Sequence, residues 1–109
     1  MNHYVAIGNV TRKPELKRLE DAVVLKIGIA TNEKKKTKSG EYKDEACFVD
    51  VDLWNKNAEW LAENLTVGAL VSVTGSLSYE QWEDKVTGER RSKHKVKASR
   101  VNLIKNRGE

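Results

Sequence analysis

Two aromatic rings and two carboxylates alternate with apolar residues between Ala46 and Trp54. A period of two predicts a strand with different faces. The apolar face carries Cys47, Val49, Val51 and Leu53, and the other carries Ala46, Phe48, Asp50, Asp52 and Trp54. The six residue steps from Phe48 to Trp54 span roughly 20 Å of strand. Rings displayed on a polar sheet face suit a ligand with flat surfaces, of which unstacked nucleic-acid bases are the commonest.

Basic residues and a third ring add to this pattern. Trp82 precedes a turn signal at Thr87-Gly88, and a basic segment returns from that turn. The candidate phosphate contacts are Lys34, Lys35, Lys36, Lys43, Lys56, Arg90, Arg91, Lys93 and Lys95. A base stacked on an aromatic ring contributes roughly 1–3 kcal/mol whatever the base, and basic side chains neutralise phosphates. The combination predicts single-strand binding, with Phe48, Trp54 and Trp82 as the stacking residues.

Asp50 and Asp52 fall between the two rings of the first stretch. They should repel phosphate, so we expect a bound backbone to arch away from the centre of this strand. Two carboxylates are too few to hold a hard cation.

The sequence offers little for catalysis. It contains no G-x-x-x-x-G-K-[ST] or G-x-G-x-x-G motif. His3 and His94 are isolated and no cysteine pair exists, so a zinc site has no ligand set. We therefore expect no catalytic residues, no metal and no cofactor.

Length and composition indicate one small intracellular domain. The chain has 109 residues and a formal charge of +4, and no apolar run approaches the roughly 20 residues that span a bilayer. We expect one domain over residues 1–106 with a short remnant at 107–109, no membrane association and a cytoplasmic location. The lone Cys47 is expected to be a buried thiol in a reducing compartment.

The hydrophobic pattern predicts an all-β chain. Expected strands cover residues 4–10, 22–30, 46–54, 70–77 (continuing towards Trp82) and 93–104, with a short extended piece at 15–19. Val71, Val73 and Leu77 are expected to face inward, and residues 32–44 to form a long charged hairpin loop. A helix stripe of Ala58, Leu61, Ala62 and Leu65 follows a cap at Asn55 or Asn57. Five strands, one short helix between strands three and four, long hairpin loops and glycines inside the strands describe a five-stranded OB-fold barrel.

The chain also resembles the OB domain of bacterial single-stranded DNA-binding proteins over roughly residues 2–104. The similar segments are Tyr4-Val5-Ala6-Ile7-Gly8-Asn9-Val10 with the following Thr11-Arg12-Lys13-Pro14-Glu15, Ile29-Ala30-Thr31-Asn32, Ser39-Gly40-Glu41, Phe48 to Lys56, and Gly75-Ser76-Leu77 through Trp82. Their order and spacing together carry the resemblance.

The resemblance implies a protein that coats and protects single-stranded DNA in replication, recombination and repair. It implies stacking at Phe48, Trp54 and Trp82, whereas the family's fourth aromatic position falls near Lys34 or Lys35. It further implies a homotetramer, with a dimer as the alternative, and a location at the nucleoid. Family members usually continue into an acidic-tipped tail that recruits replication and repair proteins, and this chain stops at Glu109.

Two other interpretations stay open. A tailless paralogue resembling primosomal replication-restart proteins would dock other replication proteins and bind strands weakly. An RNA-binding OB module resembling cold-shock proteins would be shorter and carry denser aromatic motifs.

Overall fold

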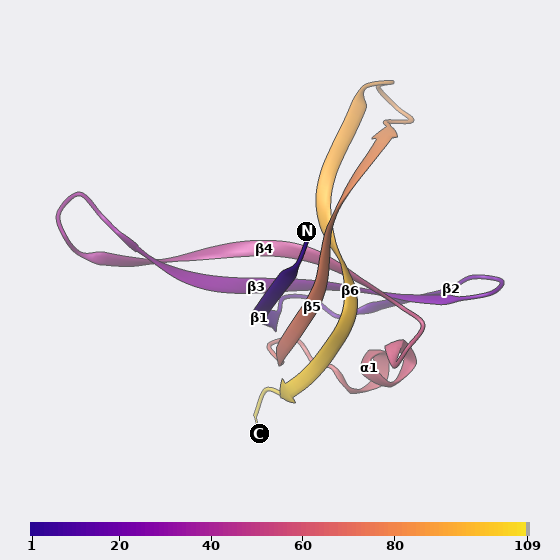
Figure 1. Cartoon of the computed structure of the whole chain (residues 1–109), viewed down its shortest axis with the longest axis horizontal. Helices are drawn as coiled ribbons and strands as arrows, with labels where there is room; N and C mark the ends of the chain where they lie inside the picture. The colour runs from indigo at the N-terminus through magenta and orange to yellow at the C-terminus, as the bar shows by residue number, and fades with distance from the viewer. Residues whose placement is uncertain (109) are drawn as a thin grey trace.

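Seven segments of regular structure make up the computed structural model, which describes residues 1–108 (Figure 1). The strands are β1 (Tyr4–Val10), β2 (Glu15–Arg18), β3 (Val23–Lys36), β4 (Tyr42–Trp54), β5 (Leu70–Glu83) and β6 (Arg90–Lys105), and the helix is α1 (Ala58–Asn64). The expected elements are thus present in the expected order, and the short extended piece is a strand in its own right.

Five strands close into a barrel. Antiparallel pairs join β1 to β5, β5 to β6, and β3 to β4, while β4 and β6 run parallel. A short pairing of Asn9 with Ala30 and Val10 with Ile29 brings β1 back to β3 and completes the ring. The β2 strand adds to the edge of β3. The predicted five-stranded OB-type barrel with one helix between β4 and β5 is confirmed.

The segment 32–44, predicted as a charged hairpin loop, is a hairpin, and its two strands run further towards the tip than the sequence indicated. The β3 and β4 strands stay paired from Val24–Trp54 out to Lys36–Tyr42. Only residues 37–41 turn, with the Thr37 amide donating to the Glu41 carbonyl at 2.7 Å and Gly40 at a φ of +89°. Apolar periodicity is missing there because both faces of the hairpin meet water. We call residues 32–46 the β3–β4 arm.

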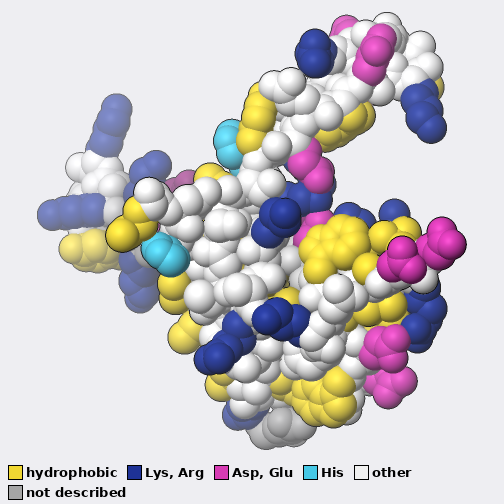
Figure 2. All heavy atoms as spheres, turned by 45° about the vertical axis from the view of Figure 1, so that its right-hand side comes forward, with side chains coloured by type: hydrophobic (Ala, Val, Ile, Leu, Met, Phe, Trp, Pro, Cys, Tyr) yellow, Lys and Arg dark blue, Asp and Glu magenta, His cyan; other side chains and the backbone are white. Residues whose placement is uncertain are grey.

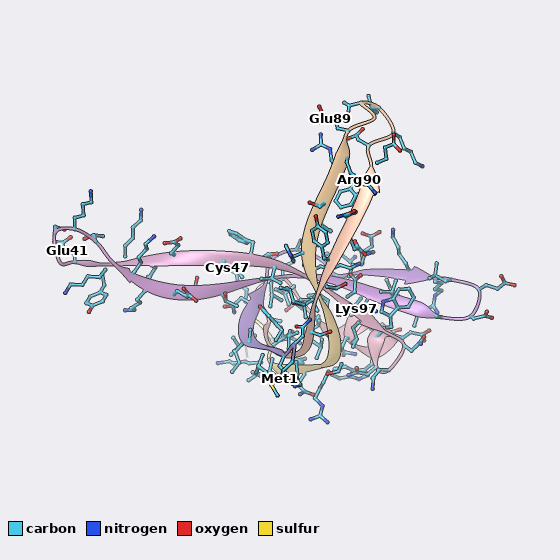
Figure 3. The ribbon with its side chains drawn as sticks, turned by 45° about the horizontal axis from the view of Figure 1, so that its top comes forward. Met1, Glu41, Cys47, Glu89, Arg90 and Lys97 are labelled. Atoms are coloured by element: carbon cyan, nitrogen blue, oxygen red, sulfur yellow. The ribbon has the colours of Figure 1, made fainter. Side chains whose placement is uncertain are left out.

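A second hairpin projects from the barrel where β5 and β6 continue past it (Figures 1 and 3). The register of β5 against β6 shifts between Thr74 and Gly75. A Cβ on Gly75 would collide with the backbone carbonyl of Lys97, so this bulge requires glycine. We call the part formed by residues 78–95 the β5–β6 arm.

The barrel encloses a core of aliphatic side chains. Its fully buried members include Leu25, Ile27, Ile29, Val51, Leu53, Leu61, Val71, Val73 and Val96. Two inward predictions are wrong: Cys47 is exposed and Leu77 is 46% exposed. The alternation points both side chains inward. They are exposed because β4 and β5 extend beyond the barrel at these residues. Figure 3 shows Cys47 on β4 between the barrel and the turn at Glu41.

The α1 helix covers one end of the core. Ala58 and Leu61 are completely buried and Leu65 nearly so, which confirms the predicted stripe. The N-cap is Asn57, but its side chain makes no cap hydrogen bond. The side-chain oxygen of Asn55 instead accepts a hydrogen bond from the Val23 backbone amide at 3.1 Å. This bond joins the start of β3 to the residue after β4. Trp60 lies outside the stripe and is 52% exposed.

The expectations for the C-terminus stay predictions. Strand β6 ends at Lys105, and the side-chain Nδ2 of Asn106 donates to the Asn64 carbonyl at 2.8 Å, so the chain is anchored at the helix end at this point. The predicted remnant 107–109 includes Glu109, which lies outside the described residues. Within residues 1–108 no helix is long and apolar enough to cross a membrane.

Candidate nucleic-acid interface

The outer face of β4 presents two aromatic rings to solvent. Phe48 is 73% exposed and Trp54 is 40% exposed. Phe48 pairs across the sheet with Ala30, whose small side chain leaves the ring uncovered, and Trp54 pairs with Val24. Residues directly opposite each other share a sheet face, so Ala30 and Val24 of β3 lie beside these rings. The predicted display of rings on the sheet surface is therefore present in the structure.

Trp82 comes to the same side of the molecule on the β5–β6 arm. It is 43% exposed and pairs with Arg91 in a register that also opposes Glu80 to Lys93 and Ser78 to Lys95. Lys93 contacts Asp50, so this face of the arm meets the outer face of β4. Trp82 also borders a shallow hollow of about 290 Å³, whose other lining residues are Glu83, Gly88 and Arg90. The three predicted stacking residues thus surround one region.

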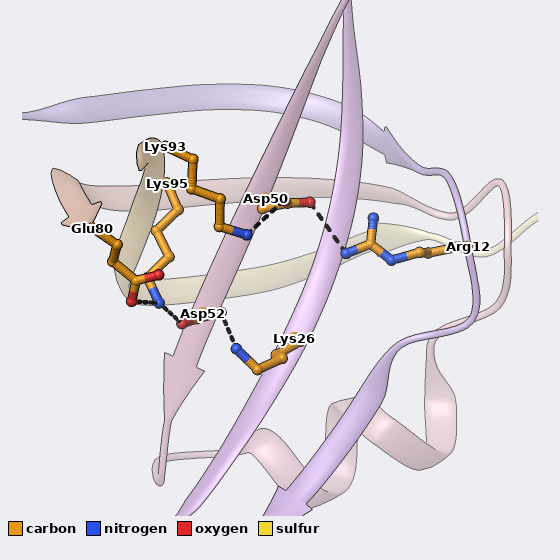
Figure 4. Close-up of polar contacts among 7 residues, drawn as sticks. All are labelled: Arg12, Lys26, Asp50, Asp52, Glu80, Lys93 and Lys95. Carbon is orange, nitrogen blue, oxygen red and sulfur yellow. Dashed lines mark hydrogen bonds and ion pairs between the residues drawn. The ribbon is translucent and has the colours of Figure 1, made fainter. Parts of the chain in front are cut away.

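Asp50 lies between the rings and is neutralised on both sides (Figure 4). Its Oδ1 accepts a hydrogen bond from Arg12 Nη2 at 3.1 Å, and its Oδ2 accepts one from Lys93 Nζ at 3.2 Å. Burial acts to raise the pKa of Asp50, but the hydrogen bonds and charges of Lys93 and Arg12 outweigh it and hold the pKa below its usual range. The carboxylate is therefore ionised and paired.

Asp52 forms a second, buried cluster. It is only 4% exposed and binds Lys95 Nζ at 2.5 Å and Lys26 Nζ at 3.5 Å. Lys95 also contacts Glu80. Burial acts to lower the pKa of Lys95, but the hydrogen bonds to Asp52 and Glu80 raise it above its ordinary value. Asp52 is therefore not exposed on the polar sheet face where the alternation placed it, because residues of the β5–β6 arm cover it.

The predicted phosphate contacts fall into separate groups. Lys95 is 9% exposed and committed to two carboxylates, so its prediction as a phosphate contact is not supported by its position. Lys93, Lys35 and Arg91 are partnered at the surface, by Asp50, by Glu45 at 3.6 Å and by Asp84 at 3.0 Å. Five form no ion pair within residues 1–108, namely Lys34, Lys36, Lys43, Lys56 and Arg90.

The register of the β3–β4 arm decides which lysines share the face of the rings. Lys34 opposes Asp44 and Lys36 opposes Tyr42, on the face of Phe48. Lys35 and Lys43 oppose each other on the other face. On the face that Figure 2 shows, basic and acidic side chains are interspersed and form no continuous basic patch. By the register, Lys34 and Lys36 are the predicted phosphate contacts of this arm that share the face of Phe48.

Sequence reasoning missed three residues of this face. Tyr42 is 69% exposed and shares the face of Phe48, six residues earlier in the same alternation. Extending the period of two back through the charged segment would have found it. Arg12 and Lys26 reach the face from other parts of the chain, and local spacing carries no signal for such contacts.

A closed barrel with exposed rings on one strand face, flanked by long hairpins, defines an OB-fold of the oligonucleotide-binding class. The sequence matches the Single-strand binding protein family over residues 1–104, so the chain belongs to that family.

Curated relatives agree with this assignment. The "Single-stranded DNA-binding protein" of Wolinella succinogenes is 40% identical over 108 residues, which cover 98% of this chain and 66% of the relative. The protein of the same name from Helicobacter hepaticus is 36% identical over 104 residues, covering 94% of this chain and 61% of the relative. The chain thus spans less than two thirds of the length of these relatives.

Solved structures share the fold. A deletion variant of the single-stranded DNA binding protein from Thermus aquaticus superposes with a TM-score of 0.85 at 28% identity, over 99% of this chain and 52% of that chain. The small single-stranded DNA-binding protein from Streptomyces coelicolor superposes with a TM-score of 0.73 at 20% identity, over 93% of this chain and 92% of that chain, a likeness of fold alone. The resemblance seen in the sequence is confirmed.

Proposed function

We propose that this chain binds single-stranded DNA without sequence preference. One observation carries the proposal: Phe48, Trp54 and Trp82 are all exposed around one region of an OB barrel. Each ring can stack a base of any identity, since every base has a π-face. The unpaired lysines Lys34 and Lys36 share the face of Phe48 and would neutralise phosphates along the β3–β4 arm.

Tyr42 extends this track. It stands across from Lys36 near the tip of the arm, on the face of the other rings. We include it as a fourth stacking residue, because the family's fourth aromatic position falls near Lys34 or Lys35 in this chain. A strand long enough to pass from the barrel onto the arm would contact it.

The test is a titration with oligo(dT) monitored by tryptophan fluorescence. Stacking on Trp54 and Trp82 is expected to quench the emission, and a duplex of equal length should compete poorly because its bases are not free to stack. Equal competition by duplex would contradict the proposal. Poly(U) and poly(dT) of matched length distinguish DNA binding from RNA binding. An RNA-binding module should bind poly(U) as tightly as poly(dT) or more tightly.

The proposed role is non-catalytic coating of exposed strands in replication, recombination and repair, in the cytoplasm at the nucleoid. Within residues 1–108 no group of three His, Cys, Asp or Glu side chains is placed to hold a metal ion. Recruitment of replication or repair proteins through a C-terminal tail would apply to a longer form of the chain.

We further propose a homo-oligomer, with a tetramer as the expected state. Val5 and Ile7 on β1 are 73% and 59% exposed, which is unusual for neighbouring aliphatic positions on one strand face and suits burial against another copy. Light scattering with and without oligo(dT) tests this. A stable dimer with weak strand affinity would instead favour a protein that docks other replication proteins. That alternative is supported by Arg12 and Lys93, which are paired with Asp50 and so less available to phosphates.

A further inference from the structure

Asp50 occupies the place on the ring face where a strand's phosphates would pass. It is two residues from Phe48 and four from Trp54 on the same side of β4, which is roughly 7 and 13 Å along the strand. A backbone whose bases stack on both rings must cross or skirt this position. The cations beside Asp50 are therefore the nearest charges that such a backbone could meet.

The contacts of Asp50 come from three separate segments of the chain. Arg12 follows β1, and the preceding Thr11 amide donates to the Gly28 carbonyl at 2.9 Å, which fixes the loop against β3. The Arg12 side chain then passes over Gly28, where any Cβ would collide with its guanidinium. Lys93 approaches from the β5–β6 arm. The fold thus directs two cations from opposite sides onto one carboxylate.

These contacts are open to exchange, unlike those of Asp52. The side chains of Asp50, Lys93 and Arg12 are 42%, 43% and 55% exposed, whereas those of Asp52 and Lys95 are 5% and 11% exposed. Exposed ion pairs contribute little to stability, so their partners can be replaced at small cost. A phosphate uses the same donors that a carboxylate does.

We propose that Asp50 is a built-in competitor of DNA phosphate, which withholds Arg12 and Lys93 from the strand and thereby lowers both the affinity and its salt dependence. This inference rests on the proposed single-strand binding. It makes position 50 a determinant of how tightly the barrel holds a strand, while Asp52 holds the arm to the barrel.

The experiment compares the intact protein with Asp50→Asn, Lys93→Gln and the double variant in oligo(dT) titrations over a range of NaCl concentrations. We expect Asp50→Asn to tighten binding about two- to fivefold, the range of one exposed ion pair. The log–log salt slope should steepen by about 0.7 for each cation that gains a phosphate.

Competition is distinguished from simple repulsion by non-additivity. With Asp50 present, Lys93→Gln should change the affinity less than about twofold, because Lys93 is already occupied. In the Asp50→Asn background the same change should abolish most of the gain in affinity and slope. Additive effects would mean that Asp50 acts only through space on the phosphates, and would overturn the inference.

Glu59→Gln is the matched control. Glu59 accepts from Arg18 at 2.6 Å in an exposed pair between α1 and β2, so this variant removes the same charge and frees an arginine whose register position is on the sheet face opposite to that of Trp54. It should leave affinity and slope nearly unchanged; a gain equal to that of Asp50→Asn would refute a local effect. Failure of every protein to bind oligo(dT) would overturn the proposed function too, whereas binding with additive effects overturns this inference alone.

Discussion

The barrel face and the β3–β4 arm differ in how they use their charges. On the barrel face the cations that reach β4 between the rings have carboxylate partners: Arg12 and Lys93 hold Asp50, and Lys26 and Lys95 hold Asp52. On the arm, Lys34 and Lys36 share the face of Phe48 and form no ion pair within residues 1–108. We therefore assign most of the base stacking to the rings around the barrel face, and most of the phosphate neutralisation to the β3–β4 arm.

The division has a structural reason. The barrel face must hold the β5–β6 arm against β4, and Asp52 with Lys95 does so in a nearly dry site. The β3–β4 arm has no such neighbour, since within residues 1–108 its strand pairing beyond the barrel is between its own two strands. Its five lysines and four acidic residues stay in water, where they cost little and can meet a ligand.

The largest expected effect is on the barrel. Trp54→Ala should weaken oligo(dT) binding by about 1–3 kcal/mol, the contribution of one base stack, without changing the salt slope. Anisotropy of a labelled oligonucleotide measures this without relying on tryptophan emission. Trp60→Ala removes another exposed indole, from α1, and should leave the affinity intact; equal losses in the two variants would remove Trp54 from the interface.

The two aspartates should differ in stability. Asp52→Asn should lower the free energy of unfolding by about 1.5–3 kcal/mol, because a buried lysine loses a charged hydrogen-bond partner. Asp50→Asn should change it by less than about 0.5 kcal/mol, as expected for an exposed pair. Urea denaturation of both variants provides the comparison, and equal losses would contradict the distinction between a buried and an exchangeable cluster.

The pH dependence of stability follows from the raised pKa of Lys95. A raised folded-state pKa gives stability that is complete below the unfolded value near 10.4 and is lost as the pH rises through the folded value. The difference in stability between wild type and Asp52→Asn should therefore be constant at neutral pH and shrink in the alkaline range. Urea denaturation at several pH values tests this; a difference that shrinks already between pH 6 and 8 would point to another group.

On the arm, charge should outweigh stacking. The double change Lys34→Gln with Lys36→Gln should reduce the salt slope by about 1.4, because each phosphate that a lysine neutralises adds about 0.7 to the slope. The control is Lys35→Gln with Lys43→Gln, which removes the same charge from the opposite face of the same hairpin. Equal reductions by the two pairs would show that net charge alone matters, not the face.

Tyr42→Ala gives the smallest expected effect. It should weaken binding by about 1 kcal/mol, the lower end for a base stack, because the ring lies near the tip of the arm. The loss should appear only with oligonucleotides long enough to reach from Trp54 to the arm. Titrations with a series of oligo(dT) lengths measure it, and a loss at every length would place Tyr42 elsewhere on the path.

Local pattern was enough to predict the strands and the outward rings, because alternation with period two directly determines which side chains share a face. The pattern did not predict burial correctly where a strand continues past the end of the barrel. Cys47 and Leu77 occupy inward positions, yet their exposure depends on how far β4 and β5 run past the strands that cover them.

The ion pairs could not be predicted for a related reason. Asp50 meets residues 38 and 43 positions away in the sequence, and only the closed barrel brings Arg12 and Lys93 to it. The sequence therefore suggested two repelling carboxylates, where the structure has two neutralised ones. The hairpin of the charged arm was predicted but the length of its strands was not, because a hairpin exposed to water on both faces has no apolar period.

The salt dependence of oligo(dT) affinity tests the division between barrel and arm most directly. We predict that the log–log line of Trp54→Ala runs parallel to that of the wild type at weaker affinity, while the line of the Lys34→Gln and Lys36→Gln double variant is shallower by about 1.4. A shallower line for Trp54→Ala, or an unchanged slope for the double lysine variant, would contradict the account.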